Sequence, residues 1–345
     1  MVGIDDEELM RFIEAASAKI VVIGAGGSGS NTLSRMTEVG IVGAKTIAMN
    51  TDARHLLVTK ADQKLILGKK LTRGLGAGSD PAVGEEAAKE SYEEIKQLIQ
   101  GADMVFITCG MGGGTGTGSA SVIAKAAKEN GALTVGVVTL PFNAEGKIRW
   151  DNAIKGLKKL RKDADTVIVI PNDKLLSLAP DLPLNAAFKI ADQVLTDAVK
   201  GITEMVTKPG LVNMDFANLK TIMQDGGYAV IGIGENTSES ETDKKADFVV
   251  RNAINSPLLD ADISKASRAL VDVVGGPEMT LKEAEYIVNG VSRQISSEAH
   301  VIWGAIIDNE LQKSVLKALV ILTGVSMPDF EQKEGEETLD LDYVD

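Results

Sequence analysis

The sequence predicts an α/β protein, in which a Rossmann-like parallel sheet is joined by a long central helix to a smaller α+β domain. Three observations predict this fold. Apolar runs typical of buried strands alternate with helical patterns over residues 19–172. An apolar stripe with helical spacing runs through residues 184–206, and four more strand-like runs follow within residues 221–327.

Changes of pattern divide the chain into six segments. We expect a helical arm, a first domain, a central helix, a loop, a second domain and a tail at residues 1–17, 18–183, 184–206, 207–220, 221–327 and 328–345. The acidic tail has one basic residue, Lys333, and its composition predicts disorder. Its apolar residues fit either a short partner-binding motif or a solubilising tail, and they are Leu339, Leu341, Tyr343 and Val344.

The composition excludes several classes of protein. Of 345 residues, 44% are hydrophobic and 25% charged, which are globular values. A net charge of −13 argues against a nucleic-acid surface, which needs clustered Lys and Arg. The single cysteine, Cys109, forms no internal disulfide and fits a reducing compartment. No apolar run reaches ~18 residues, and the acidic N-terminus is unlike a signal peptide, so we expect no membrane insertion.

The most informative stretch is the glycine-rich segment at residues 110–118. Five glycines fall within residues 112–118, with Thr115 and Thr117 between them. The preceding run, 103–109, predicts a buried strand, and residues 119–128 have the pattern of a helix. Backbone N–H groups of such a loop, together with the helix dipole, attract phosphate. A tight turn needs only one or two glycines, so we interpret the segment as an anion site.

A second glycine-rich turn, residues 24–31, follows a predicted strand at 19–23. It contains the spacing G-x-G-x-x-G, which ends at Gly29. Asp52 lies about 20 residues further on, after the next predicted strand. Taken alone, this pattern is typical of a dinucleotide site and suggests an NAD-dependent oxidoreductase.

A third glycine-rich loop, residues 71–78, weighs against the oxidoreductase, because a dinucleotide fold needs only one such turn. Three loops at strand ends can instead surround a triphosphate. The chain lacks the P-loop pattern G-x-x-x-x-G-K-[ST]. Phosphate charge must therefore be met by backbone dipoles, a metal ion and scattered side chains.

Glu145 and Arg149 follow a predicted strand at 131–138 and share a face if they are helical. They fit either a surface ion pair or a site with Glu145 on a ribose hydroxyl and Arg149 near phosphate. A further predicted strand, 166–170, precedes Asn172. Every glycine loop falls at a strand end, where ligands of parallel sheets bind.

The start of the predicted helix 184–206 carries Phe188 and Asp192, four residues apart. Phe188 fits a core position or a ring that stacks on a purine. A carboxylate beside it can accept hydrogen bonds from the N1–H and exocyclic amine of guanine, a pattern that adenine does not offer.

After Lys208-Pro209-Gly210, which stops the helix, polar residues Asn213, Asp215 and Asn218 alternate with apolar ones. They fit either a loop that caps the next helix or a functional loop. Residues 221–327 contain no catalytic constellation. The two histidines, His55 and His300, are far apart, and no metal-ligand cluster stands out.

The segments described above resemble the tubulin/FtsZ family in its FtsZ form. The chain as a whole is more similar to the archaeal type than to the bacterial type. The segment 110–118 carries the family signature, and agreement continues at residues 50–53, 71–78, 170–176 and 256–259. The resemblance covers roughly residues 18–325. It implies a GTP-binding cell-division protein that forms head-to-tail filaments and a cytokinetic ring in the cytoplasm, with GTP or GDP and Mg²⁺ bound.

The resemblance also implies partners and site residues. Partners would be further copies of the chain, division-ring proteins and a membrane tether, which the tail could bind. Phosphate and sugar contacts are implied for Gly26, Gly27, Ser28, Gly29, Asn31, Ala77, Gly78, Gly116, Thr117 and Gly118. Ribose and phosphate contacts are implied for Glu145 and Arg149, and guanine contacts for Asn172, Phe188 and Asp192. The matching loops add Asn50, Asp52, Gly110, Gly112, Gly113, Gly114, Thr115 and Pro141 to the nucleotide site. Mg²⁺ would rest on phosphate oxygens and waters, with no protein ligand.

The loop at 213–218 matches the family's catalytic loop, whose pattern is Asn-x-Asp-x-x-Asp, except that its last position is Asn218. An amide cannot act as a general base, although it can orient a water. Three explanations fit: Asp215 supports hydrolysis alone, turnover is weak, or the residue was changed to trap a nucleotide.

The predicted central helix separates the base-binding residues from this loop by ~35 Å, at ~1.5 Å per residue. Asp215 should therefore reach only the γ-phosphate of a neighbouring subunit, in a head-to-tail contact that extends into filaments. The sequence thus predicts a polymerising GTPase whose hydrolysis depends on assembly. The alternatives are a non-hydrolysing structural or regulatory relative and the NAD-dependent oxidoreductase.

Overall fold

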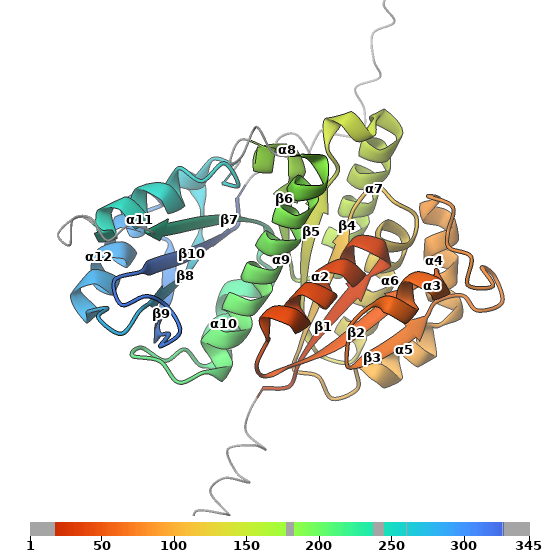
Figure 1. The fold of residues 1–345 in the computed structure, drawn as a ribbon, viewed down its shortest axis with the longest axis horizontal. Coiled ribbons are helices and arrows are strands. Elements are labelled where there is room, and N and C mark those ends of the chain that lie inside the picture. Colours follow the sequence, from red (N-terminus) through yellow and green to blue (C-terminus); the bar gives the residue numbers. More distant parts are fainter. Residues whose placement is uncertain (1–17, 177–182, 237–244, 260, 326, 328–345) are drawn as a thin grey trace, which may run out of the picture.

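The computed structural model describes residues 18–176, 183–236, 245–259, 261–325 and 327. The predicted N-terminal arm and the acidic tail lie outside the described residues. The described chain forms one continuous ten-stranded sheet with helices packed on it (Figure 1). The strands are β1 (Ile20–Ala25), β2 (Ala44–Asn50), β3 (Gln63–Ile66), β4 (Met104–Gly110), β5 (Leu133–Leu140), β6 (Thr166–Pro171), β7 (Gly227–Asn236), β8 (Arg268–Gly275), β9 (His300–Ile307) and β10 (Leu316–Thr323).

The strand order is β3-β2-β1-β4-β5-β6-β7-β10-β8-β9. The strands from β3 to β7 pair in parallel, and β10 then pairs antiparallel with both β7 and β8. The predicted fold class is confirmed, but the two parts of the sheet are joined. Strand β7 pairs with β6 over Thr166–Ile168, so the second domain extends the first sheet. The sequence did not indicate this pairing or the short strand β3.

Helices cover both faces of the parallel part of the sheet, and two further helices pack on its second part. The helices of the described chain are α2 (Gly26–Val39), α3 (Ala53–Val58), α4 (Pro81–Glu90), α5 (Tyr92–Leu98), α6 (Thr115–Glu129), α7 (Lys147–Asp163), α8 (Asn172–Leu176), α9 (Leu184–Thr207), α10 (Phe216–Met223), α11 (Lys245–Ile254) and α12 (Leu281–Ser292). Of these, α11 packs on β7 and β10, and α12 packs on β8 and β9. Successive residues of β1 explain why both faces are covered. Val21 and Ile23 belong to one core cluster, whereas Ile20 and Val22 belong to the other. Both faces are therefore apolar, as in other parallel sheets.

Helix α9 runs between the two parts of the molecule (Figure 1). It spans 24 residues where the apolar stripe predicted a helix over 184–206. Val194, Leu195, Ala198 and Ile202 are buried on its inner face. The helix contacts α2 and β5 on one side and β8 and β9 on the other. Because it packs on both parts of the sheet, α9 joins them through side-chain contacts as well as through the chain.

Candidate functional site

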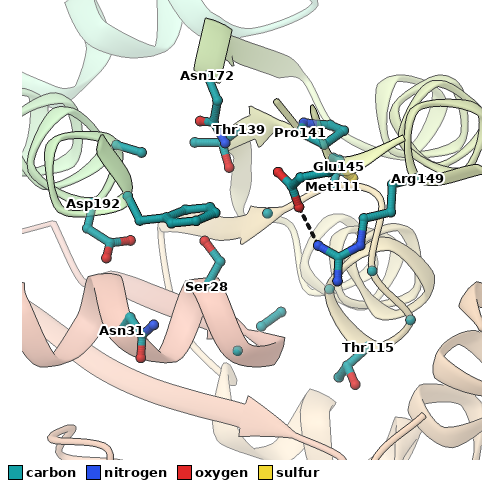
Figure 2. Close-up of a pocket in the computed structure, with 18 of the residues that line it drawn as sticks. Ser28, Asn31, Met111, Thr115, Thr139, Pro141, Glu145, Arg149, Asn172 and Asp192 are labelled. Atoms are coloured by element: carbon teal, nitrogen blue, oxygen red, sulfur yellow. Dashed lines mark hydrogen bonds and ion pairs between the residues drawn. The ribbon is translucent and has the colours of Figure 1, made fainter. Parts of the chain in front are cut away.

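A cavity of about 430 Å³ opens at the carboxyl ends of β1, β4, β5 and β6, beside the start of α9. This is the edge at which parallel sheets bind ligands, and the size suits a small organic molecule. The predicted site residues that line it are Gly27, Ser28, Asn31, Gly110, Gly113, Gly114, Thr115, Gly116, Pro141, Glu145, Arg149, Asn172, Phe188 and Asp192. Figure 2 shows that several of these side chains converge on one space from separate elements.

Two helices begin at this cavity without a side-chain cap. Helix α2 starts at Gly26 and α6 at Thr115, and neither N-cap side chain accepts a hydrogen bond from the first turn. Helices α5, α7 and α9 also lack a side-chain cap, whereas α3, α4, α10 and α12 are capped by Asp52, Asp80, Asp215 and Thr280. Uncapped N-termini leave backbone N–H groups and a positive dipole end without a protein partner. Both are thus available to an anion in the cavity.

Glycine allows these two helix starts to approach each other. A Cβ atom on Gly26 would lie 2.8 Å from the backbone nitrogen of Gly116, and Gly26 has a φ of +72°. A side chain would therefore both clash and strain the backbone. The third glycine loop lies alongside, since a Cβ on Gly114 would lie 2.9 Å from the Ala77 Cβ. All three predicted loops meet at one place.

Several predicted site residues lie beside the cavity and do not line it. They are Gly26, Gly29, Asn50, Asp52, Ala77, Gly78, Gly112, Thr117 and Gly118. Thr117 is buried, and its hydroxyl accepts a hydrogen bond from the Gly112 N–H at 2.8 Å, which holds the glycine loop in shape. Gly118 packs against α4, where a Cβ would lie 2.1 Å from the Pro81 oxygen. Thr117 and Gly118 thus support the loop and the helix that lie behind the cavity lining.

Asp52, which the oxidoreductase reading assigned to a ribose, caps α3 instead. Its carboxylate accepts hydrogen bonds from the N–H groups of Arg54 at 2.9 Å and His55 at 3.1 Å. The bond from His55 is the main cause that lowers the pKa of Asp52. Asp52 therefore does not present a ribose-binding carboxylate to the cavity.

Glu145 and Arg149 form an ion pair at the mouth of the cavity (Figure 2). Glu145 ends a short 3-10 turn, Asn143–Glu145, and its second oxygen accepts from the Phe142 N–H at 2.9 Å. Arg149 lies in the first turn of α7. The pair is partly exposed and also faces the cavity. The two interpretations of these residues, a surface ion pair and a ribose and phosphate site, are therefore compatible.

The opposite end of the cavity suits a purine. Phe188 is 41% exposed, so it is not a core residue, and its ring meets Phe142 edge to face with centroids 5.1 Å apart. Asn172 is buried, and its side-chain oxygen has no hydrogen-bond partner among the described residues. Leaving a buried oxygen without a partner costs free energy, so this oxygen is suited to accept a hydrogen bond from a ligand.

Asp192 lies on α9 beside this end and accepts a hydrogen bond from the Thr32 hydroxyl at 3.1 Å. Burial raises the pKa of Asp192 to about 6, while the bond from Thr32 and the charge of Arg35 oppose the rise. A ligand that donates two hydrogen bonds to this carboxylate would favour its charged form.

The cavity also contains residues that the sequence did not single out. They are Ala25, His55, Met111, Thr139 and Ala191. Met111 directly follows β4, and Thr139 is the last but one residue of β5, so the position near a strand end was a usable signal. His55 gave no such signal, because it reaches the cavity only through the packing of α3 against α2.

The loop at 213–218 lies beyond the other end of α9. The Asp215 carboxylate caps α10 by accepting from the Asn218 N–H at 2.7 Å, and the Asn213 side chain accepts from the Gly210 N–H at 2.7 Å. Asn213, Asp215 and Asn218 are exposed, whereas Met214 and Leu219 are buried anchors. None of the three lines the cavity.

Two family models match the chain. The Tubulin/FtsZ family GTPase domain matches residues 19–180, and the FtsZ family C-terminal domain matches residues 227–326. The cell division protein FtsZ 1 of Thermococcus kodakarensis is 56% identical over 96% of this chain and 88% of the relative. The chain belongs to the tubulin/FtsZ family. The resemblance read from the sequence, including its archaeal type, is confirmed.

Solved structures of the family agree. A structure described as an empty FtsZ dimer of M. jannaschii has a TM-score of 0.88 and 54% identity, with 94% of this chain and 93% of that chain covered. CetZ2 of Haloferax volcanii shares the fold at 24% identity, with a TM-score of 0.77, 89% of this chain and 93% of that chain being covered.

This member of the tubulin/FtsZ family is a GTP-binding, polymerising cell-division GTPase. The alternative of an NAD-dependent oxidoreductase is therefore wrong, since its G-x-G-x-x-G turn belongs to a GTPase domain. Within the described part of the chain, no helix is long and apolar enough to cross a membrane.

Proposed function

We propose that this chain hydrolyses GTP at the junction between two subunits stacked head to tail, with the Asp215 loop of one subunit facing the nucleotide of the next. The observation that carries the proposal is the separation of the two halves of the site by α9. This helix has 24 residues, which corresponds to about 36 Å. A carboxylate at one end cannot contact a phosphate at the other.

The nucleotide end is assigned from the cavity. The uncapped starts of α2 and α6 hold the phosphates, and Glu145 and Arg149 face the ribose and the phosphates. Asn172, Phe188 and Asp192 hold the base, and the carboxylate selects guanine because it accepts from N1–H and the exocyclic amine.

Mg²⁺ accompanies the nucleotide in this proposal. Among the described residues no group of three His, Cys, Asp or Glu side chains is placed to hold a metal ion. The ion would therefore rest on phosphate oxygens and waters, where it would neutralise charge on the phosphates.

The hydrolytic end consists of Asp215 and Asn218. One Asp215 oxygen caps α10, which fixes the carboxylate and leaves its remaining lone pairs for a water. Asp215 orients this water and accepts its proton, and the exposed Asn218 amide helps to orient it. The contact between subunits is heterologous, so it extends into a filament and does not close.

In the cell we place these filaments at the division ring. The relatives at 51–57% identity are described as cell division proteins. Attachment of the ring through the acidic tail to a membrane tether stays a prediction, because the tail lies outside the described residues.

The test is GTP turnover per molecule against protein concentration. A site completed by a neighbour gives negligible turnover below a threshold concentration and a constant rate per assembled molecule above it. Filaments without turnover at any concentration would support the non-hydrolysing alternative that Asn218 suggests. Equal rates per molecule in dilute and concentrated samples would contradict the shared site.

A further inference from the structure

Among the described residues that line the cavity, His55 is the one that carries a titratable side chain and has no role in the site so far. It lies in α3, and its ring packs against the first turn of α2, where a Cβ on Gly27 would be 3.5 Å from the ring carbon Cε1. Both ring nitrogens have partners. Nδ1 lies 3.3 Å from the Asn50 amide nitrogen, and Nε2 lies 3.1 Å from the Asn31 side-chain oxygen.

The direction of each hydrogen bond follows from one backbone group. The Asp52 N–H can only donate, and it bonds to the Asn50 side-chain oxygen at 3.2 Å. The Asn50 side-chain NH₂ group therefore faces His55. Because that group is a donor, Nδ1 of His55 must accept.

A neutral imidazole that accepts at Nδ1 carries its proton on Nε2. Nε2–H therefore donates to Asn31, and the Asn31 atom that receives it must be the oxygen. The other end of the Asn31 amide, its NH₂ group, is then turned away from His55. Asn31 lies on α2 at the edge of the cavity (Figure 2).

We infer that His55 is a positioning residue of the nucleotide site. The Asp52 N–H fixes the direction of each hydrogen bond from Asn50 through His55 to Asn31. As a result, the Asn31 NH₂ group is presented to the nucleotide. This inference rests on the proposed nucleotide contact of Asn31. A donor suits the anionic phosphates and the sugar oxygens, whereas a flipped amide would offer its oxygen and repel phosphate. His55 itself has no free ring nitrogen for the ligand.

The first test is the tautomer of His55 in the nucleotide-free protein. The chain has only two histidines, so ¹⁵N-labelled protein gives two sets of imidazole signals, and a His300→Phe variant assigns them. We expect His55 to be protonated on Nε2 with Nδ1 unprotonated at pH 7.5. A proton on Nδ1, or an exchanging mixture of tautomers, would overturn the relay.

The second test is the affinity for a fluorescent GDP analogue. An Asn31 side chain freed from His55 must be ordered on binding, so His55→Phe should weaken binding about three- to tenfold. Its matched control is His300→Phe, which changes an exposed histidine on β9 and should leave the affinity unchanged. If His55 acts through Asn31, adding His55→Phe to Asn31→Ala should cost less than about twofold more.

The outcomes separate the inference from the proposed function. Normal affinity of Asn31→Ala would remove the proposed nucleotide contact itself. Weak binding by Asn31→Ala with normal binding by His55→Phe would overturn the positioning role alone. Equal losses from His55→Phe in both backgrounds would also overturn it, because His55 would then act independently of Asn31. Near-UV circular dichroism of His55→Phe checks that the fold is retained.

Discussion

Asn218 is the residue at which this chain departs from the loop pattern that its resemblance to the family implies. Its side chain is exposed, and only its backbone N–H takes part in the capping of α10. A carboxylate at this position would lie beside Asp215 without disturbing the cap. It would add a second group able to accept a proton from the attacking water.

We therefore expect Asn218→Asp to raise GTP turnover above the assembly threshold by at least about tenfold, measured as phosphate release. The matched control is Asn213→Asp, which adds the same charge to the same loop. A carboxylate oxygen there can still accept from the Gly210 N–H, so the loop keeps its shape. Filaments of Asn218→Asp with an unchanged rate would argue against a catalytic position at 218.

We expect Asp192 to link nucleotide affinity to pH. Burial raises its pKa to about 6 in the free protein. In the proposed site the base is bound by the ionised carboxylate. Affinity should thus be full above about pH 7 and fall as the pH drops through 6, with about tenfold weaker binding at pH 5. Titration with a fluorescent GDP analogue between pH 5 and 8 measures this profile.

The control for this profile is Asp197→Asn, one turn or so further along α9. Burial raises the pKa of Asp197 too, but this residue does not line the cavity. Its replacement should leave the pH profile in place, whereas Asp192→Asn should weaken binding and flatten the profile. A flat profile in the unmodified protein would remove Asp192 from the base contact.

At the scale of elements, the packing of α9 on the second part of the sheet contains an unusual group. Asp272 lies on β8 and is 2% exposed, and its Oδ1 has no hydrogen-bond partner among the described residues. Glu204 of α9 lies close enough to influence it. Burial, and then the charge of Glu204, raise the pKa of Asp272 to about 8. This carboxyl is thus held neutral between the helix and the sheet.

The linkage between protonation and folding gives a stability prediction. In the unfolded chain the pKa of Asp272 is about 3.9. Between about pH 4 and pH 8, Asp272 therefore keeps its proton in the folded state, whereas it has lost this proton in the unfolded state. The contribution of Asp272 to stability is complete below pH 4 and is lost at about 1.4 kcal/mol per pH unit up to pH 8.

Asp272→Asn removes this loss, so it should become progressively more stable than the unmodified protein as the pH rises from 5 to 8. Urea unfolding at pH 5.0, 6.5 and 8.0 measures the difference. Asp262→Asn is the control, since a hydrogen bond from Ser264 lowers the pKa of this exposed carboxyl and it is ionised across the whole range. Parallel stability curves for Asp272→Asn and the unmodified protein would show that Asp272 is ionised in the fold.

At the scale of the whole molecule, the fold keeps the cavity and the 213–218 loop, which are the proposed nucleotide site and hydrolytic loop, at opposite ends of α9. A filament would bring them together by repeating the same contact, so every interior subunit would supply a loop to one neighbour and a nucleotide to the other. Two defective variants should then complement each other.

Asp215→Asn keeps an N-cap side chain for α10 but removes the charge, and it should bind GTP without hydrolysing it. Asp192→Ala keeps the loop but loses the base contact. Mixed in equal amounts, they should recover about a quarter of the normal GTP turnover, because that share of junctions pairs a good pocket with a good loop. Mixed filaments, seen by electron microscopy, that stay inactive would contradict catalysis between subunits.

Much of the architecture could be predicted because it depends on local patterns. Largely apolar runs of five to eight residues predicted the buried strands β1, β4, β5 and β6, and the glycine loops pointed to a phosphate site. The pairing of β6 with β7 could not be predicted, because a strand's apolar pattern does not identify its neighbour. Phe188 also remained ambiguous, because the sequence does not show whether an aromatic residue on a helix faces a core or a cavity.

The parallel sheet, the family and an anion site could be predicted from the amino-acid sequence, because strand periodicity, glycine spacing and motif order are properties of the chain. Which residues face one another depends on how the elements pack. In the folded chain Asp52 caps a helix, the Asn172 oxygen has no partner among the described residues, and His55 packs against Asn31. These relations join elements that are remote in sequence or rotated relative to one another, and hydrogen bonding and burial depend on that arrangement in space.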